Sequence, residues 1–391
     1  MIWIIALCSI VIAGLDYLAT RKFLFERQKL FKWVLGALWA IDAMPFIFSL
    51  GCFLFTSDNP TELHIISGWI SFAYMILVIS HAPLSLCFAM SRRVWLWVIG
   101  GVAMVGAMAI FVYSMVVTLT DYEVRRVVIE SAELPASFDG YRIVQLSDLH
   151  IGTLLEPEEE IAEIAEICNS LQPDMVAFTG DLVNIRYSEL TDRVCEALKK
   201  FQYKDSFYSI IGNHDLGGYI KDSISLTQEV NTERLLSRER ALGWSVLDNQ
   251  TEYIKRGGDS IAITGISFPK ILHEDRHSSR LPDIGLDRVY RDVEKGVFNI
   301  TLCHIPQLWE DILALHPVNL TLSGHVHAMQ MVLKVSNMRI SPSRIQYKRW
   351  SGLYEEQGHY LYINDGIGYV MYPMRVGARP EITVFELRVR K

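Results

Sequence analysis

The chain lacks the patterns that would identify several common classes of protein. Its six cysteines are scattered, so neither a disulfide framework nor zinc-ribbon spacing is present. Acidic residues outnumber basic residues by 44 to 37, and the formal net charge of -7 argues against binding to nucleic acid, which needs a basic surface. No serine or cysteine nucleophile motif is visible, so nothing indicates a covalent intermediate on the protein.

The first apolar stretch, residues 2–19, lacks the basic start and the small-x-small cleavage site of a secretory signal. We therefore interpret it as a retained anchor. Three further stretches reach the length of about 20 residues that a helix needs to cross a bilayer, at residues 33–55, 64–90 and 94–118. The sequence thus predicts a transmembrane region of about four helices in residues 1–120, followed by a globular domain in residues 121–391.

Charges in the loops between these stretches predict how the chain crosses the membrane. The first loop carries five basic residues and the third carries two arginines, whereas the second carries only Asp58 and Glu62. By the positive-inside rule, the first and third loops face the cytoplasm. Two arginines directly after the fourth stretch weigh mildly against this orientation. We expect a multi-pass membrane protein with residues 121–391 on the extracytoplasmic side.

Ionisable residues also occur inside the apolar stretches: Asp16 in the first, Asp42 in the second and His81 in the third. A carboxylate at membrane depth is costly, so it suggests either a transport role or a contact that fixes helix packing. No transport motif accompanies these residues, and we favour the packing role. A transporter with a regulatory domain is the weakest of the function classes considered.

Beyond residue 120, short runs of strand type alternate with helical patterns. Strands are expected at residues 123–130, 141–146, 175–178, 207–211, 252–254, 261–266, 298–303, 319–322, 360–363 and 382–387. Helices are expected at residues 158–170, 189–200, 232–242 and 308–315. This order predicts an α/β domain in which crossover helices join parallel strands and antiparallel strands are added late.

Five of the expected strands end in turns that carry metal-binding residue types. These residues are Asp148 and His150, Asp181, Asn213 with His214, His304, and His325 with His327. In open α/β sheets, ligands bind outside the carboxyl ends of the strands, so all five turns can converge on one edge. Five coincidental polar turns would be a much weaker explanation than one shared site.

The chemistry of this set indicates a metal centre. Mixed nitrogen and oxygen donors suit manganese, iron or zinc better than calcium, which prefers oxygen alone. The donors are too numerous for one ion with an open position, and they suit two divalent ions that share a carboxylate. By contrast, His273 and His277 stand in a polar stretch with Pro282 and Gly285, which we interpret as a solvated loop.

The motifs resemble those of the calcineurin-like metallophosphoesterases, and the resemblance covers about residues 141–387. They are Asp148-x-His150, Gly180-Asp181, Gly212-Asn213-His214-Asp215, His304 and Gly324-His325-x-His327. The layout of four spans resembles that of transmembrane proteins with a metallophosphoesterase domain. The resemblance implies a four-layer αββα sandwich.

It also implies a role for each motif residue. The first ion would be held by Asp148, His150, Asp181 and His327, and the second by Asp181, Asn213, His304 and His325. Asp181 would bridge the two ions. His214 would protonate the leaving oxygen or stabilise charge on the phosphate.

Some positions depart from the family pattern or lie outside it. Related sequences commonly have an acid where Asn184 stands, and a glycine near Ala328 or Met329. None of these is a ligand. A cluster of basic and aromatic residues follows the last motif: Arg344, Tyr347, Arg349 and Trp350. One interpretation is that it binds a phosphate or a lipid surface. The other is that it is a solvated loop with Trp350 in the core. The turn at residues 364–368 is expected to frame the site.

The expected function is a membrane-anchored, dinuclear-metal phosphoesterase that hydrolyses phosphate mono- or diesters, lipid-linked esters among them, with metal-activated water. The alternative is a membrane sensor or scaffold that retains the fold with little turnover. The complete ligand set favours the enzyme. The identity of the metal, the type of ester and the oligomeric state stay open at this point.

Overall fold

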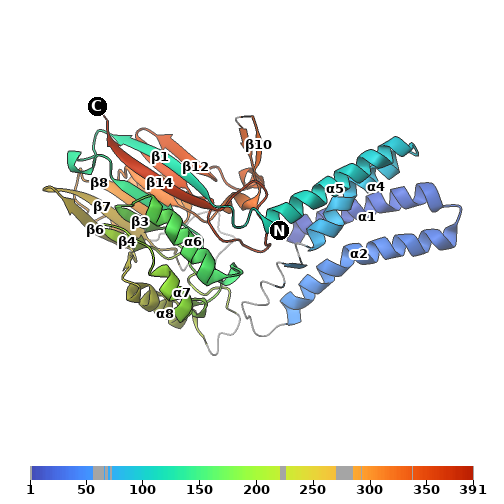
Figure 1. Cartoon of the computed structure of the whole chain (residues 1–391), viewed down its shortest axis with the longest axis horizontal. Coiled ribbons are helices and arrows are strands. Elements are labelled where there is room, and N and C mark those ends of the chain that lie inside the picture. Colours follow the sequence, from blue (N-terminus) through green and yellow to red (C-terminus); the bar gives the residue numbers. More distant parts are fainter. Residues whose placement is uncertain are drawn as a thin grey trace. The chain divides into compact units, whose positions relative to one another are not determined.

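The computed structural model describes residues 2–55, 66, 69–70, 73–220, 226–269, 285–291, 293–336 and 338–390. The chain divides into two compact units, one of Met1–Val117 with Met371–Val376 and one of Thr118–Val370 with Gly377–Lys391 (Figure 1). The predicted loop residues Asp58, Glu62, His273 and His277 lie outside the described residues.

The first unit is helical. Its elements are α1 (Ile2–Leu24), α2 (Gln28–Phe55), a π-helical segment (Met75–Ile79), α4 (Ser80–Met90) and α5 (Val94–Val116). In the described part of the chain, α5 is the one helix long and apolar enough to cross a membrane. Many of its aliphatic side chains are exposed, among them Val98 and Val102, as suits a helix surrounded by lipid. The bundle of about four membrane helices expected from the sequence is not established by these helices.

Polar contacts join α1 to α4 within this unit. Ser85 Oγ donates to Asp16 Oδ1 at 2.5 Å, and His81 Nε2 lies 3.2 Å from Asp16 Oδ2. Asp42 on α2 belongs to the same cluster, in which Asp16, Asp42 and His81 each place a polar atom within 4.8 Å of the others. These contacts agree with a packing role for the ionisable residues of the apolar stretches.

The second unit contains two six-stranded sheets. The first has the order β1-β14-β2-β3-β4-β5, with bounds Glu123–Ser131, Glu381–Val389, Arg142–Leu146, Met175–Phe178, Ser206–Ser209 and Ser245–Val246. The second has the order β12-β13-β9-β8-β7-β6, with bounds Gly352–Glu356, His359–Ile363, Leu320–Ser323, Phe298–Cys303, Asp259–Ile266 and Gln250–Arg256. The centre of each sheet is parallel, and β14, β12 and β6 add antiparallel pairings.

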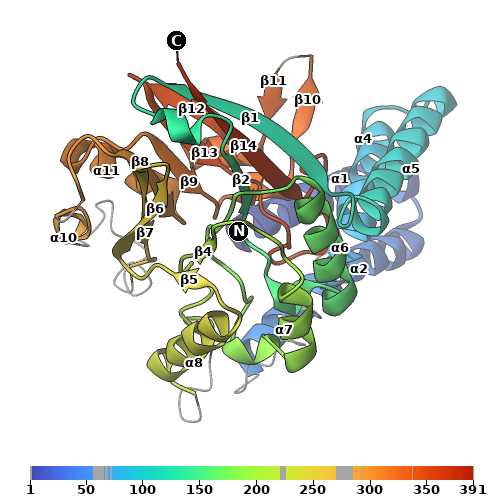
Figure 2. The same ribbon diagram turned by 60° about the vertical axis from the view of Figure 1, so that its left-hand side comes forward.

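Helices cover the outer face of each sheet (Figure 2). One core layer packs α6 (Pro157–Ser170), α7 (Asp192–Leu198) and α8 (Gln228–Ala241) on the first sheet. A second layer lies between the sheets, and a third packs α10 (Leu286–Val289) and α11 (Trp309–Leu315) on the second sheet. The predicted α/β class is confirmed, with layers in the order helix, sheet, sheet, helix.

The sequence pattern explains why α6 forms where it does. Pro157 occupies the first turn, where its missing N–H costs nothing, and three glutamates follow at the positive end of the helix dipole. Ile161, Ile164 and Cys168 recur at helical spacing and are buried against the first sheet.

Several short elements were not expected from the sequence, among them β5, β12, α10 and a hairpin of two strands. Strands β10 (Leu333–Val335) and β11 (Met338–Ile340) pair in an antiparallel hairpin. The hairpin projects away from both sheets, as both ribbon views show (Figures 1 and 2). Its strands are only three residues long, which is too short for the alternation of polar and apolar residues to stand out in the sequence.

Candidate metal centre

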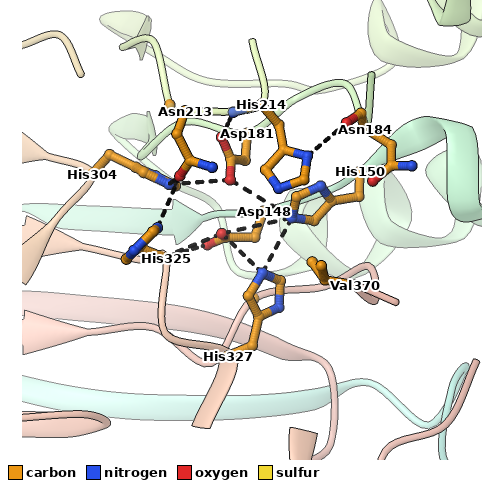
Figure 3. Close-up of polar contacts among 12 residues, drawn as sticks. Asp148, His150, Asp181, Asn184, Asn213, His214, His304, His325, His327 and Val370 are labelled. Atoms are coloured by element: carbon orange, nitrogen blue, oxygen red, sulfur yellow. Dashed lines mark hydrogen bonds and ion pairs between the residues drawn. The ribbon is translucent and has the colours of Figure 1, made fainter. Parts of the chain in front are cut away.

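The loops after β2, β3, β4, β8 and β9 converge at one edge of the two sheets. They bring together all seven predicted ligands and His214, whose side chains point toward one another (Figure 3). All of them except the partly exposed His325 are buried. The parallel pairings of β2–β3–β4 and β8–β9 cause this convergence, because parallel strands place their carboxyl ends side by side.

Asp148, His150 and His327 form one group. His327 Nε2 lies 3.1 Å from Asp148 Oδ1 and 3.1 Å from His150 Nε2. His150 Nε2 lies 3.9 Å from the same carboxylate oxygen. Each residue offers one donor atom, and the three atoms lie within 4.8 Å of one another.

Asp181, His304 and His325 form a second group, with Asn213 beside them. His304 Nε2 lies 3.1 Å from Asp181 Oδ2 and 3.2 Å from Asn213 Oδ1, and His325 Nδ1 lies 2.9 Å from Asn213 Oδ1. Asp181 Oδ2 is also 3.8 Å from His150 Nε2. Asp181 therefore faces both groups, as a bridging carboxylate must.

The donor chemistry of the two groups fits divalent cations. His304 Nδ1 donates to the Thr179 carbonyl at 2.7 Å, so Nε2 is the ring nitrogen directed at Asp181 and Asn213 and is the atom that a metal ion would bind in place of a proton. At most one proton can lie between the facing Nε2 atoms of His150 and His327, so at least one of them presents a lone pair. Lone pairs and carboxylate oxygens that converge in a buried space are what a metal ion requires.

Burial and charge set the protonation of these groups. Burial would raise the pKa of Asp148 and Asp181, but the neighbouring imidazoles outweigh it and lower the pKa of both carboxyls. Burial, together with the charge of His304, lowers the pKa of His325 to about 3. Burial would lower the pKa of His304 as well, yet the Asp181 carboxylate raises it to about 9. The site therefore holds ionised carboxylates, which attract cations.

His214 is held at the edge of the centre. Its backbone N–H donates to Asp181 Oδ1 at 2.7 Å, and its Nδ1–H donates to the Asn184 carbonyl at 2.6 Å. Its ring stacks on Tyr219 with centroids 4.3 Å apart and meets the ring of His150 edge-on. Since a main-chain carbonyl orients His214, the absence of an acidic side chain at position 184 does not remove its partner.

Asp215 braces two of the ligand loops. The sequence placed it in the Gly-Asn-His-Asp motif but assigned it no role. Its carboxylate accepts from the backbone N–H groups of Gly212, Asp181 and Leu182 at 2.8 Å each, and of Val183 at 3.1 Å. The loop after β3 and the loop after β4 are therefore joined through one buried side chain.

Glu189 braces the neighbouring loops in the same manner. It accepts from the backbone N–H groups of Gly152, Asn184, Ile185 and Arg186 at 2.6 to 3.2 Å. The predicted helix at residues 189–200 begins later, at Asp192, because Glu189 belongs to this bracing turn. The sequence contains no signal for its role, since it lies in no motif.

Glycines let the ligand loops approach one another. A Cβ atom on Gly212 would overlap the Asp181 carboxylate, and one on Gly324 would overlap the side chains of Ser147 and Asp148. Ala328 and Met329 have φ values of 49° and 45°, in the left-handed region that favours glycine. The resemblance predicted a glycine near these positions; this chain has Ala and Met there, in a conformation that is strained for residues with a Cβ atom.

The turn at residues 364–368 lies against the Asp148 loop, in the place expected for it. Ile367 N–H donates to the Ser147 carbonyl at 3.1 Å, and Gly368 N–H donates to the Asp148 carbonyl at 2.8 Å. The predicted basic-aromatic cluster is divided in the structure. Trp350 is buried in a core cluster, and Arg349 pairs with Glu310 at 2.8 Å, whereas the exposed Arg344 is a surface residue.

A cavity of about 860 Å³ lies beside the second ligand group. Ile211, which directly precedes the loop of Asn213, and Phe268 are among its lining residues. The ring of Phe268 lies 6.3 Å from that of His304 and 6.4 Å from that of His325. None of the seven predicted ligands lines the cavity, so it adjoins the ligand loops and not the ligand atoms themselves.

This fold, with two adjacent groups of candidate metal ligands, is that of the metallophosphoesterases, and comparison with known proteins agrees. Residues 141–329 match the calcineurin-like phosphoesterase family. The chain is 31% identical to the uncharacterized metallophosphoesterase YkuE of Bacillus subtilis, over 66% of this chain and 83% of that protein. The chain belongs to the calcineurin-like phosphoesterase family.

Two further similarities are partial. The chain is 29% identical to a transmembrane protein with metallophosphoesterase domain of Danio rerio, over 71% of this chain and 60% of the relative. It therefore spans about three fifths of that protein. The crystal structure of phosphopantetheinyl hydrolase from Mycobacterium tuberculosis aligns with a TM-score of 0.31 and 15% identity, over 55% of this chain and 95% of that one, which is too low to bear on function.

Proposed function

We propose that this protein is a membrane-anchored phosphoesterase that uses two divalent cations, of manganese, iron or zinc, to hydrolyse phosphate mono- or diesters. One observation carries the proposal. Seven nitrogen and oxygen donors converge as two adjacent groups, and Asp181 faces both of them. A protein that had lost catalysis would not need to keep the whole set together with His214.

The proposed ligands follow the two groups. Asp148, His150, Asp181 and His327 would hold one ion, and Asp181, Asn213, His304 and His325 the other. When bound, such a pair of ions acidifies a water molecule for attack on phosphorus and neutralises charge on the phosphate oxygens.

The protein's own contribution to the chemistry is carried by His214. With Nδ1–H donated to the Asn184 carbonyl, the Nε2 atom is the one available to substrate. Burial lowers the pKa of His214, while the nearby Asp181 carboxylate opposes this shift. Entry of an anionic phosphate favours the imidazolium, which can pass its Nε2 proton to the leaving oxygen.

We further propose that residues 1–120 form the membrane region and that residues 121–391, the catalytic domain, lie outside the cytoplasm. The apolar helix α5 and the basic loops around residues 21–32 and 92–93 support this arrangement. Similarity to proteins named as transmembrane proteins with a metallophosphoesterase domain supports the membrane association, and the orientation rests on the basic loops alone. The substrates would then be exported or lipid-linked phosphate esters.

The enzymatic proposal is tested with the full chain purified in detergent. Metal analysis should find two ions per chain, and the protein supplied with manganese should hydrolyse bis(4-nitrophenyl) phosphate or 4-nitrophenyl phosphate. Two bound ions without turnover of any ester would instead favour the sensor or scaffold. The absence of bound metal would contradict both alternatives.

A further inference from the structure

The β10–β11 hairpin carries apolar side chains on one face and basic side chains on the other. Leu333 pairs with Ile340 and Val335 pairs with Met338, while Lys334 pairs with Arg339 between them. Because successive residues of a strand point to opposite faces, the four aliphatic side chains share one face. The two basic residues occupy the other face.

The aliphatic face of this hairpin is open to solvent in the described part of the chain. Leu333 is 62% exposed and Met338 is 61% exposed, and Val335, Ile340 and the nearby Ile345 are exposed as well. An isolated two-stranded hairpin has little stability of its own in water. A contiguous aliphatic patch on such an element therefore indicates a surface that binds something apolar.

The base of the hairpin is fastened to the catalytic domain near the metal centre. Its first strand begins six residues after the predicted ligand His327. Arg339 donates to Asp365 Oδ2 at 2.9 Å. Asp365 belongs to the turn at residues 364–368, and Ile367 and Gly368 of this turn donate to carbonyls of the Asp148 loop. The hairpin is thus connected to the loop of Asp148 through the turn at residues 364–368.

The same base lies beside the point where the chain enters the domain from α5. Lys334 Nζ is 3.9 Å from Glu123 Oε1, and Glu123 is the first residue of β1. Six residues separate the end of α5 at Val116 from Glu123, and they span at most about 25 Å. A bilayer crossed by α5 would therefore lie within reach of the hairpin.

We propose that the β10–β11 hairpin inserts its aliphatic face into the bilayer surface and presents the metal centre to phosphate esters carried by lipids. The choice of a bilayer rests on the short connection to α5 and on the side chains themselves. The patch is aliphatic and lacks the Trp and Tyr typical of protein interfaces, and the exposed basic residues Lys334 and Arg344 suit lipid phosphates.

This inference rests on the proposed phosphoesterase function for its substrate class, but insertion can be measured without catalysis. The full chain is reconstituted into phosphatidylcholine–phosphatidylglycerol nanodiscs, with an environment-sensitive fluorescent amino acid at position 338. The matched control carries the same probe in place of Leu315, which is 55% exposed on α11 of the same domain. Brominated lipids should quench the probe at 338 and leave the probe at 315 unchanged; equal behaviour at the two positions would overturn insertion.

The substrate class is tested by a charged variant and its control. Leu333→Glu with Met338→Glu is compared with Leu155→Glu with Leu315→Glu, since Leu155 is exposed to a similar extent, at 64%. The rate at which the hairpin variant cleaves phosphatidic acid in the bilayer should be lower than that of wild type by about tenfold or more. The reason is that each aliphatic side chain withdrawn from lipid weakens membrane binding by about tenfold. Its rate on soluble 4-nitrophenyl phosphate and bis(4-nitrophenyl) phosphate should stay within about twofold of wild type, as should both rates of the control.

The outcomes separate the two proposals. Quenching at 338 together with a selective loss on the lipid ester supports the inference. An equal loss on lipid and soluble esters would show that the hairpin acts on the site itself, and would overturn its role in presenting lipids. If the wild type cleaves soluble esters but no lipid phosphate, the substrate class is wrong. If it cleaves neither, the proposed function fails, while the quenching result still decides insertion.

Discussion

At the scale of single residues, the centre depends on side chains that serve two neighbours at once. Asp181 faces His150 and His304 through the same oxygen and accepts the backbone N–H of His214 through the other. His304 turns its Nε2 toward Asp181 and Asn213 because its Nδ1 is bonded to a carbonyl. Each such residue has few acceptable substitutes, since a change at one atom affects two contacts.

Replacing the shared carboxylate should remove both metals. Asp181→Asn keeps the size of the side chain but loses the charge that both ions would share, so we expect metal content near zero and no measurable hydrolysis. Plasma emission spectrometry of the purified full chain, alongside an activity assay, measures both. Retention of two ions, or activity close to wild type, would show that Asp181 is not the bridge.

Removing the candidate acid should affect chemistry and spare metal binding. His214→Ala should retain both ions and lose about 10²–10⁴-fold in rate, the usual contribution of a positioned acid. The loss should be smaller for nitrophenyl esters, whose leaving groups need no proton, than for alkyl esters. An equal loss on both kinds of ester would assign His214 to binding or electrostatics.

At the scale of elements, the ligand loops are positioned by two carboxylates that bind no metal in the proposed centre, the buried Asp215 and the partly buried Glu189. Asp215 connects the loops after β3 and β4, and Glu189 connects the loop after β2 to residues 184–186. Backbone amides buried in such loops would otherwise have no partner, and leaving one unsatisfied costs about 1–3 kcal/mol. The geometry of the centre therefore depends on residues behind it.

Disturbing this bracing should loosen the site. In Asp215→Asn one oxygen becomes an NH₂ group that cannot accept, so part of the four-amide network is lost. We expect unfolding to become easier by about 1–3 kcal/mol, and metal affinity to fall. Thermal denaturation with and without manganese measures both effects. Asp192→Asn, at an exposed carboxylate, is the control and should change stability by less than about 0.5 kcal/mol; an equal effect of the two variants would contradict the bracing role.

At the scale of the whole molecule, the chain has a net negative charge and consists of an apolar helical unit and an α/β unit. Many aliphatic side chains of α5 are exposed, and two loops of the first unit, around residues 21–32 and 92–93, are basic. Under the proposed orientation, the centre would meet only phosphate esters outside the cytoplasm, because a domain on that side has no access to cytoplasmic nucleotides.

The orientation is tested on intact cells. Protease added to spheroplasts that express the full chain should cut the catalytic domain away, because the basic loops hold the first and third connections inside. A cytoplasmic marker protein must stay intact as the control. Protection of the domain until the membrane is broken would reverse the orientation, and a cytoplasmic lipid precursor would become the better substrate.

The sequence by itself determined the α/β class, the strands that end in polar turns and the residues that meet there. This was possible because these properties are local: β3 and β8 have the predicted bounds, since continuous apolar runs between turn residues specify buried strands. Parallel order then places the carboxyl ends of neighbouring strands together. The metal-binding roles of these residues stay predictions until metal analysis is made.

Only the tertiary structure decided the features that depend on distant partners. The bracing by Glu189, the burial of Trp350 and the exposure of the β10–β11 hairpin cannot be read from neighbouring residues, because each is set by what packs across the fold. The length of the apolar runs does not determine how many helices cross the membrane either, since an apolar run suits a bilayer and a protein core alike. The local sequence pattern thus identified the candidate metal ligands. Packing across the fold decided which residues position them and that the β10–β11 hairpin is exposed.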